Sequence, residues 1–167
     1  MNLEGRARLF GNDVNTDAII LSSRKRQTID ANELKKFMFE SIDPSFAASV
    51  QPGDILVAGT NFGCGSAMEV AVTVVQAAGI RAVLARSFAR SFYRNAINNG
   101  LLVMECDTSL IREGDRLSVQ LSDGSATARN LTTNHVIEGT PMPEIMLRIL
   151  DRGGLVEYLR ATGGFTA

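Results

Sequence analysis

Three short apolar runs separated by two helix-length segments constrain the fold of this 167-residue chain more than any other feature. Each run has the length of a strand buried on both faces: Ile55–Ala58, Ala82–Ala85 and Leu101–Cys106. Met68–Ala78 is apolar at nearly every position and is followed by Gly79, which predicts a buried helix with a glycine stop. Phe88–Ile97 has the pattern of a second helix. This order predicts a parallel βαβαβ core with right-handed crossovers.

Further strands are predicted outside that core. Gly5–Phe10 has the alternation of a first strand. Arg116–Leu121 and Ser125–Leu131 flank a Ser-Asp-Gly turn, as the two strands of a hairpin do. We therefore expect an α/β fold with a parallel heart and antiparallel additions, forming one domain over residues 1–167.

Further helices are predicted near the two ends of the chain. Asp30 has the position of an N-cap, with Glu33 as its reciprocal partner, for a helix from about Ala31 to Phe39. Near the C-terminus, Pro143 precedes an Ile/Leu stripe that ends at a Gly-Gly pair, which predicts a helix and then a last short amphipathic turn.

Composition excludes several classes of function. The 17 basic and 18 acidic side chains give a net charge of −1, so no bulk charge points to nucleic acid or to a membrane surface. No leader segment or membrane-length apolar run is present, so we expect a soluble, cytoplasmic protein. Cys64 and Cys106 are too few to hold an iron–sulfur cluster, and His135 stands alone. We expect no metal site on this chain.

The segment Gly59–Glu69, GTNFGCGSAME, carries the strongest chemical signal. A strand that runs into three glycines and then a helix gathers backbone N–H groups and the positive end of a helix dipole around one small volume, which suits an anion. We expect Ser66, at or just before the first helical residue, to present its hydroxyl to the ligand beside Gly65. The alternative is an N-capping serine after a tight turn.

Three separated blocks of the chain carry a family resemblance. GTNFGCGSAMEVA and the following SFARSFYRNAINNGLL, the early NDVNTDAII, and the ending PMPEIMLRILDRGGLVEYLR occur in this order. Together they resemble the small, swivelling subunit of isopropylmalate isomerase, homoaconitase and related aconitase-like dehydratases. The resemblance implies a swivelling β/β/α domain that closes over a large subunit carrying a 4Fe-4S cluster, with a hydroxy di- or tricarboxylic acid as substrate.

The resemblance also implies roles for individual residues. Ser66 matches the serine that abstracts the proton next to a substrate carboxylate, and Asp17 matches an acidic residue that arranges the active site. Arg24 and Arg26 lie where relatives place residues that contact the distal part of the substrate. Gly65, Ala67 and Met68 are the remaining expected substrate-binding positions. Cys64 is implied to be a packing residue of the loop.

This chain departs from the family pattern beside the catalytic serine. The pattern there is Cys-Gly-Ser-Ser-Arg-Glu-His, and this chain has Ala67, Met68 and Val70 in place of the second serine, the arginine and the histidine. An arginine grips a carboxylate and adds positive charge, and methionine does neither.

The departure leaves three interpretations open. The first is a hydro-lyase of altered specificity, in which Arg24, Lys25 or Arg26 replaces the lost cation and Met68 faces an apolar substituent. The second is ordinary isopropylmalate or aconitate chemistry with a relocated arginine. The third is a catalytically degenerate subunit that binds an anion or a partner.

Overall fold

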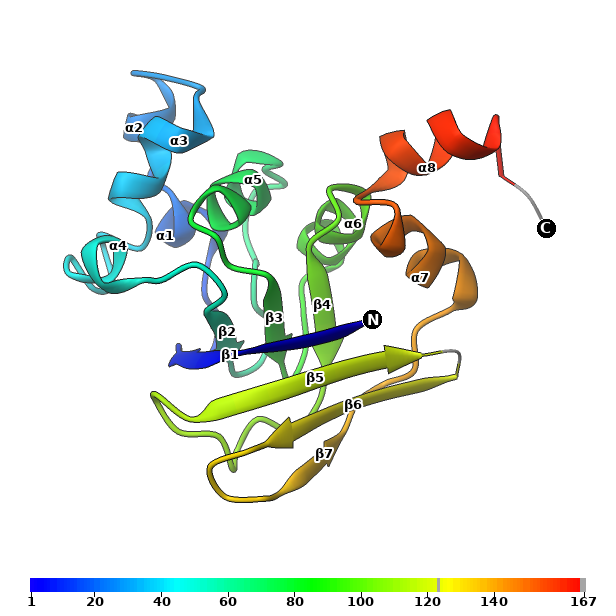
Figure 1. Cartoon of the computed structure of the whole chain (residues 1–167). Coiled ribbons are helices and arrows are strands. Elements are labelled where there is room, and N and C mark those ends of the chain that lie inside the picture. The colour runs from blue at the N-terminus through cyan, green and yellow to red at the C-terminus, as the bar shows by residue number, and fades with distance from the viewer. Residues whose placement is uncertain (123, 166–167) are drawn as a thin grey trace.

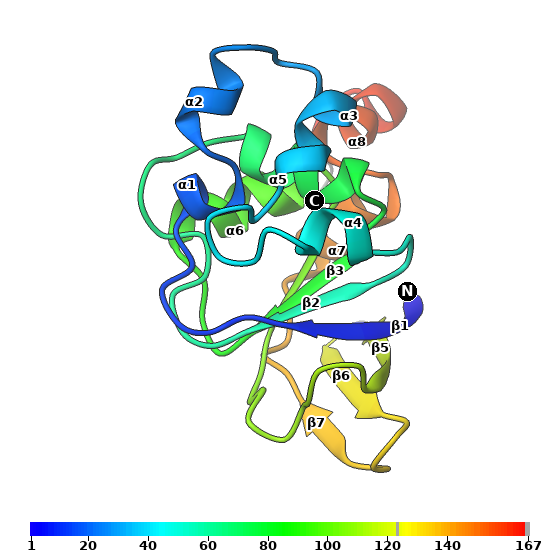
Figure 2. The same ribbon diagram turned by 90° about the vertical axis from the view of Figure 1, so that its left-hand side faces the viewer.

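The computed structural model describes residues 1–122 and 124–165 and forms one curled, seven-stranded sheet in the order β4-β3-β2-β1-β5-β6-β7 (Figures 1 and 2). The strands are β1 Asn2–Leu9, β2 Ile55–Ala58, β3 Ala82–Ala85, β4 Leu102–Glu105, β5 Arg116–Ser122, β6 Ser125–Asn130 and β7 Val136–Glu138. Strands β1 to β4 pair in parallel, and β1, β5, β6 and β7 pair antiparallel. The predicted α/β fold with antiparallel additions is confirmed, although β7 was not foreseen.

The helices lie mainly over the parallel half of the sheet (Figure 1). They are α1 Thr16–Ile19, α2 Ser22–Lys25, α3 Ala31–Leu34, the 3-10 turn η1 Lys35–Phe37, α4 Phe46–Ser49, α5 Val70–Ala77, α6 Arg90–Asn98, α7 Glu144–Asp151 and α8 Leu155–Thr162. Because β2, β3 and β4 are neighbours in sequence order, right-handed crossovers put α5 and α6 on the same face. No helix among the described residues is both long and apolar enough to cross a membrane.

The sheet curls so far that its two edges meet at one corner. Cys106, just after β4, forms an antiparallel bridge with Gly139, just after β7. The Thr140 amide donates to the Glu105 carbonyl at 2.8 Å. Figures 1 and 2 show the helices on one side of β2–β4 and strands β5–β7 on the other. This closure explains why every residue of β2 and β3 is buried.

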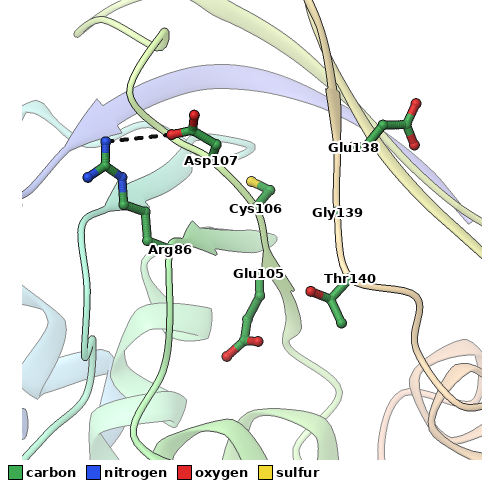
Figure 3. A pocket seen from close by; sticks show the side chains of 7 residues that line it. All are labelled: Arg86, Glu105, Cys106, Asp107, Glu138, Gly139 and Thr140. Atoms are coloured by element: carbon green, nitrogen blue, oxygen red, sulfur yellow. Dashed lines mark ion pairs between the residues drawn. The ribbon is translucent and has the colours of Figure 1, made fainter.

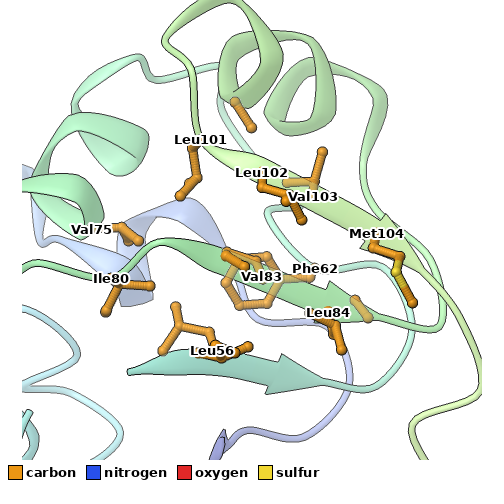
Figure 4. Close-up of a cluster of buried hydrophobic side chains, with 14 of the residues drawn as sticks. Leu56, Phe62, Val75, Ile80, Val83, Leu84, Leu101, Leu102, Val103 and Met104 are labelled. Atoms are coloured by element: carbon orange, nitrogen blue, oxygen red, sulfur yellow. The ribbon is translucent and has the colours of Figure 1, made fainter. Parts of the chain in front are cut away.

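The main core fills the space between the parallel strands and α5. Leu56, Val83 and Val103 from three adjacent strands pack with Val75 of α5 and with Phe62 of the following loop (Figure 4). Each such side chain contributes roughly 1.5–3 kcal/mol by leaving water. Since Phe62 is fully buried, this core also fixes the loop after β2.

A second cluster ties the segment between β1 and β2 to the sheet. The ring of Phe10 stacks on Phe39 at 4.2 Å between centroids, and Phe46 meets both rings edge-on at 5.2 and 5.0 Å. Phe39 and Phe46 are buried. We call residues 15–50 the arm. The packing of these three rings holds the arm against the sheet.

The helix expected over residues 31–39 is shorter than predicted. The Asp30 carboxylate does cap it, accepting the Asn32 N–H at 2.8 Å. The reciprocal half of the box is wrong, because the Asp30 N–H donates to the Thr28 hydroxyl at 3.1 Å and Glu33 instead pairs with Lys36. The helix narrows to a 3-10 turn and ends before Phe39, whose φ of 59° is left-handed.

The buried carboxylate of Asp54 crosslinks the start of β2 to β1. It accepts from Arg6 at 2.8 Å, from Arg8 at 3.4 Å and from the Gln51 N–H at 3.0 Å. Burial alone would raise the pKa of Asp54, but the hydrogen bonds from Arg6, Gln51 and Arg8 outweigh it and lower the pKa. The folded state therefore holds Asp54 ionised.

Replacing Asp54 should measurably weaken the fold. Asp54→Ala leaves the buried Arg8 with only Glu113 as an ionic partner, so we expect a loss of roughly 3 kcal/mol in urea unfolding at neutral pH. Because the folded pKa is lowered, this stabilisation is present above about pH 4 and disappears as pH falls through the folded value. The difference in unfolding free energy between the wild type and Asp54→Asn should therefore become smaller in acid. The exposed Asp107→Ala is the matched control, with an expected change within about 0.5 kcal/mol.

Candidate active site

The loop after β2 is joined to the segment after β1 by a row of hydrogen bonds. The Gly63 N–H donates to the Val14 carbonyl, and the Thr16 N–H donates to the Cys64 carbonyl, both at 2.8 Å. The Thr16 hydroxyl donates to the carbonyl of Ser66, also at 2.8 Å. Because β1 and β2 are parallel neighbours, both segments lie at the carboxyl edge of the sheet. The structure thus joins the backbone of Ser66 to Thr16, the residue before Asp17.

Gly65 allows the close approach of these two segments. Its φ is +88°, and a Cβ there would lie 2.7 Å from the side-chain oxygen of Asn15. That same oxygen accepts the Asp17 N–H at 2.8 Å and caps α1. A side chain at Gly65 would therefore disturb the cap that orients Asp17.

Ser66 is exposed and lies farther from helix α5 than expected. The helix begins at Val70, and Glu69 rather than Ser66 holds the N-cap position. Both the expected placement at the helix start and the alternative of an N-capping serine are therefore wrong. The Ser66 hydroxyl has no hydrogen-bond partner within the described residues, and the N–H groups from Ser66 to Val70 donate to none of them. Within the described residues, the Ser66 hydroxyl and these backbone N–H groups are therefore available to bind a ligand.

Asp17 holds the beginning of α2. Its carboxylate accepts the Ser22 hydroxyl at 2.6 Å and the Ser22 N–H at 2.8 Å. These two bonds lower the pKa of Asp17, and the positive charge of Lys25 adds to the effect. The ionised carboxylate is suited to arranging the site.

The three cations of the segment Arg24–Arg26 have different surroundings. The guanidinium of Arg24 donates to both oxygens of Glu40, at 2.8 and 2.9 Å, and lies 3.9 Å over the ring of Phe37. This pairing raises the pKa of Arg24 and lowers that of Glu40. Arg26 is exposed and forms no ion pair within the described residues.

Lys25 points to the loop instead. Its ammonium contacts the sulfur of Met68, 43 positions along the chain. The structure thus links the Ser66 carbonyl to Thr16, the residue before Asp17, and links Met68 to Lys25, while it engages Arg24 in the arm. Sequence reasoning named Lys25 only as one of three possible cations, and it missed Thr16; the hydroxyl within NTD was the only available signal.

A cavity of about 520 Å³ lies at the corner where the sheet closes (Figure 3). It is lined by Glu105, Asp107 and Glu138, with Arg86 paired to Asp107 at 3.5 Å. Burial, together with the charge of Asp107, raises the pKa of the Cys106 thiol to about 12, so that thiol stays protonated. None of the predicted site residues lines this cavity, and its carboxylates disfavour an acidic substrate.

The fold and the site loop can now be compared with known proteins. Residues 10–109 match the Aconitase C-terminal domain family. This chain belongs to that family. The Isopropylmalate/citramalate isomerase small subunit of Methanocaldococcus jannaschii is 48% identical over 95% of this chain and 94% of its own length. A 3-isopropylmalate dehydratase small subunit of Methanopyrus kandleri is 46% identical over 96% of this chain and 94% of its own length.

Solved structures agree with this family membership. The 3-isopropylmalate dehydratase structure from Methanocaldococcus jannaschii superposes with a TM-score of 0.91 and 42% identity, covering 98% of this chain and 96% of that one. The aconitase X structure from Thermococcus kodakaraensis, with a TM-score of 0.53 and 14% identity over 83% of this chain and 90% of that one, shares the fold alone. This aconitase-family chain therefore has the arrangement of the isopropylmalate dehydratase small subunits throughout its length.

Gly65→Ala tests the close approach of the two segments. The substitution places a Cβ against Asn15 at a left-handed φ, so we expect a loss of about 1–2 kcal/mol from the backbone and of roughly 1 kcal/mol more from the disturbed cap. Gly114→Ala is the matched control, because its φ is +83° and its Cβ would meet nothing within 4 Å. Urea unfolding gives the difference. Equal losses in the two variants, with unshifted Thr16 and Asp17 amide resonances in Gly65→Ala, would contradict this account.

Proposed function

We propose that this chain is the small subunit of a hydro-lyase that removes water from a hydroxy di- or tricarboxylic acid, and that it works only with a large subunit. The similar proteins are named as small subunits of an isopropylmalate/citramalate isomerase or of 3-isopropylmalate dehydratases. The observation that carries the proposal is the exposed Ser66, whose carbonyl is bound by Thr16 while its hydroxyl has no hydrogen-bond partner among the described residues.

We assign the 4Fe-4S cluster of this enzyme class to the large subunit. A 4Fe-4S cluster is held by several cysteine thiolates, usually four. Cys64 lies in the site loop and Cys106 is buried after β4, and the described residues contain no group of three or more potential metal ligands. The residues of this chain do not fit the cluster, so the steps assigned to this chain use its own side chains alone.

Ser66 is the proposed base. Its alkoxide would take a proton from the carbon next to a substrate carboxylate, and the electrons of that C–H bond would form the double bond as the hydroxyl group departs. The departing hydroxyl would take a proton from an acid on the large subunit and leave as water. A serine is a poor base unless its negative charge is stabilised. The N–H groups from Ser66 to Val70, which donate to no other described residue, would supply that stabilisation. Asp17 is a positioning residue, because it holds the helix that carries Lys25.

The second candidate is a degenerate subunit that binds an anion or a partner without supporting turnover. The observation that favours it is Met68, which stands where the family pattern has an arginine. Altered specificity explains the same substitution, since a thioether next to Ser66 suits an apolar substituent on the substrate. Measured turnover decides between the two.

We further propose that residues 1–167 act as one swivelling domain and that the complex works in the cytoplasm. The sheet closes on itself through the bridge between Cys106 and Gly139, which supports a single unit. The free thiols of Cys64 and Cys106 suit a reducing compartment.

Ser66→Ala should abolish turnover of the complex. Loss of a general base costs about two to four orders of magnitude in kcat. The hydroxyl has no partner in the described structure, so the melting temperature and subunit association should stay unchanged. Coexpression with the large subunit, reconstitution without oxygen and an absorbance assay for the unsaturated acid give the measurement. Near-normal turnover would instead rule out Ser66 as the base.

The isolated chain should bind no cluster. Purified alone and treated anaerobically with iron and sulfide, it should remain colourless, since two cysteines cannot supply the thiolates that a cluster needs. The complex, treated in the same way, should gain the brown colour and stoichiometric iron. A cluster assembled on the isolated chain would end the assignment.

A further inference from the structure

We propose that Lys25 supplies the positive charge that binds a substrate carboxylate beside Ser66, and that Met68 forms the apolar wall next to that carboxylate. The inference rests on the proposed function, because it assigns a binding role within the same site. It replaces Arg24 and Arg26 as the cations expected to contact the substrate.

The first observation is the contact between the Lys25 ammonium and the Met68 sulfur, both partly buried. A thioether is a weak acceptor and carries no charge to balance the ammonium. No carboxylate lies within ion-pair distance of Lys25 among the described residues. A partly buried cation without a counter-ion is poised to gain from an anionic ligand.

The second observation concerns the interaction partners of the other cationic side chains of the arm. Arg24 is held by Glu40 and Phe37. Lys35 donates to the Ala77 carbonyl at 3.1 Å, and Lys36 pairs with Glu33. Arg26 is exposed and makes no contact with the site loop among the described interactions. Of the cations on the arm, Lys25 is the one that the described structure joins to the loop.

The third observation is that Lys25 is held in place from both ends of its helix. Asp17 binds Ser22 at the start of α2, and the Lys25 N–H donates to the Leu21 carbonyl at 3.4 Å. Arg24, the residue before it, fastens the helix to Glu40. The hydrogen bonds from Ser22 and, to a lesser extent, the charge of Lys25 lower the pKa of Asp17. Both Ser22 bonds go to one Asp17 oxygen, Oδ1, and Asp17 forms no ion pair with Lys25 among the described residues. The ammonium is therefore positioned without a direct ion pair.

This arrangement predicts a class of substrate. An ammonium is a point charge, whereas an arginine fork selects a coplanar carboxylate through two parallel bonds. With Met68 in place of the fork, the site offers one charge and an apolar surface. It suits a substituted malate whose alkyl group lies beside the bound carboxylate.

The kinetic test uses the coexpressed, reconstituted complex and a panel of alkyl-substituted malates. Lys25→Ala should raise KM at least tenfold with little change in kcat, and Lys25→Arg should keep part of the affinity. Lys36→Ala, an exposed lysine paired on the neighbouring turn, is the matched control and should change KM by less than about twofold. Met68→Arg added to Lys25→Ala should recover much of the lost affinity.

A binding test separates this inference from the proposed function. With methionine methyl groups labelled with carbon-13 and Met68 assigned through Met68→Leu, malonate should shift the Met68 signal of the native complex. Lys25→Ala should weaken malonate binding at least tenfold. Unchanged malonate affinity or unchanged KM in Lys25→Ala overturns the role of Lys25, even if the native complex is active. Malonate binding that depends on Lys25, without turnover of any acid in the panel, supports the inference and overturns the catalytic function.

Discussion

The site depends on the double pairing of strand β1. This strand pairs in parallel with β2 on one side and antiparallel with β5 on the other, so the sheet changes direction there. In open α/β sheets, ligands bind in the crevice outside the carboxyl ends of the parallel strands. The segment after β1 carries Thr16 and Asp17, and the loop after β2 carries Ser66. Their hydrogen-bonded join is a direct consequence of the topology.

The arm adds the charge that this edge lacks. Aromatic packing of Phe39 and Phe46 against Phe10 anchors it to the sheet, and the Arg24–Glu40 pair fastens its short helix α2. A helix of one turn has little stability of its own, so these tertiary contacts decide where its side chains lie. They turn Arg24 into a structural residue and leave Lys25 as the cation at the site.

Much of the fold was predictable because its signals are local. The apolar runs of β2, β3 and β4 and the glycine after α5, whose φ is +84°, follow from neighbouring residues alone. What the sequence missed depends on distant partners. Contacts that no local pattern displays set three features of the structure. These are the start of α5 at Val70, the absence of the expected Glu33 cap, and the pairing of Arg24 with Glu40. Strand β7 is three residues long and finds its place only through β6.

Met68 shows the same difference between what the local sequence pattern indicates and what the spatial arrangement provides, here for the charge of the site. Along the sequence, an arginine is missing beside the serine, and the local pattern indicates a site that has lost its charge. In space, the methionine sulfur contacts the ammonium of Lys25, which comes from a helix 43 positions earlier. A cation can stabilise an anion from any element that brings it within a few ångströms, since Coulomb attraction depends on distance and not on chain order. If Lys25 binds a substrate carboxylate, as we propose, the positive charge of the site lies on a lysine instead of an arginine, with a different geometry and an apolar neighbour.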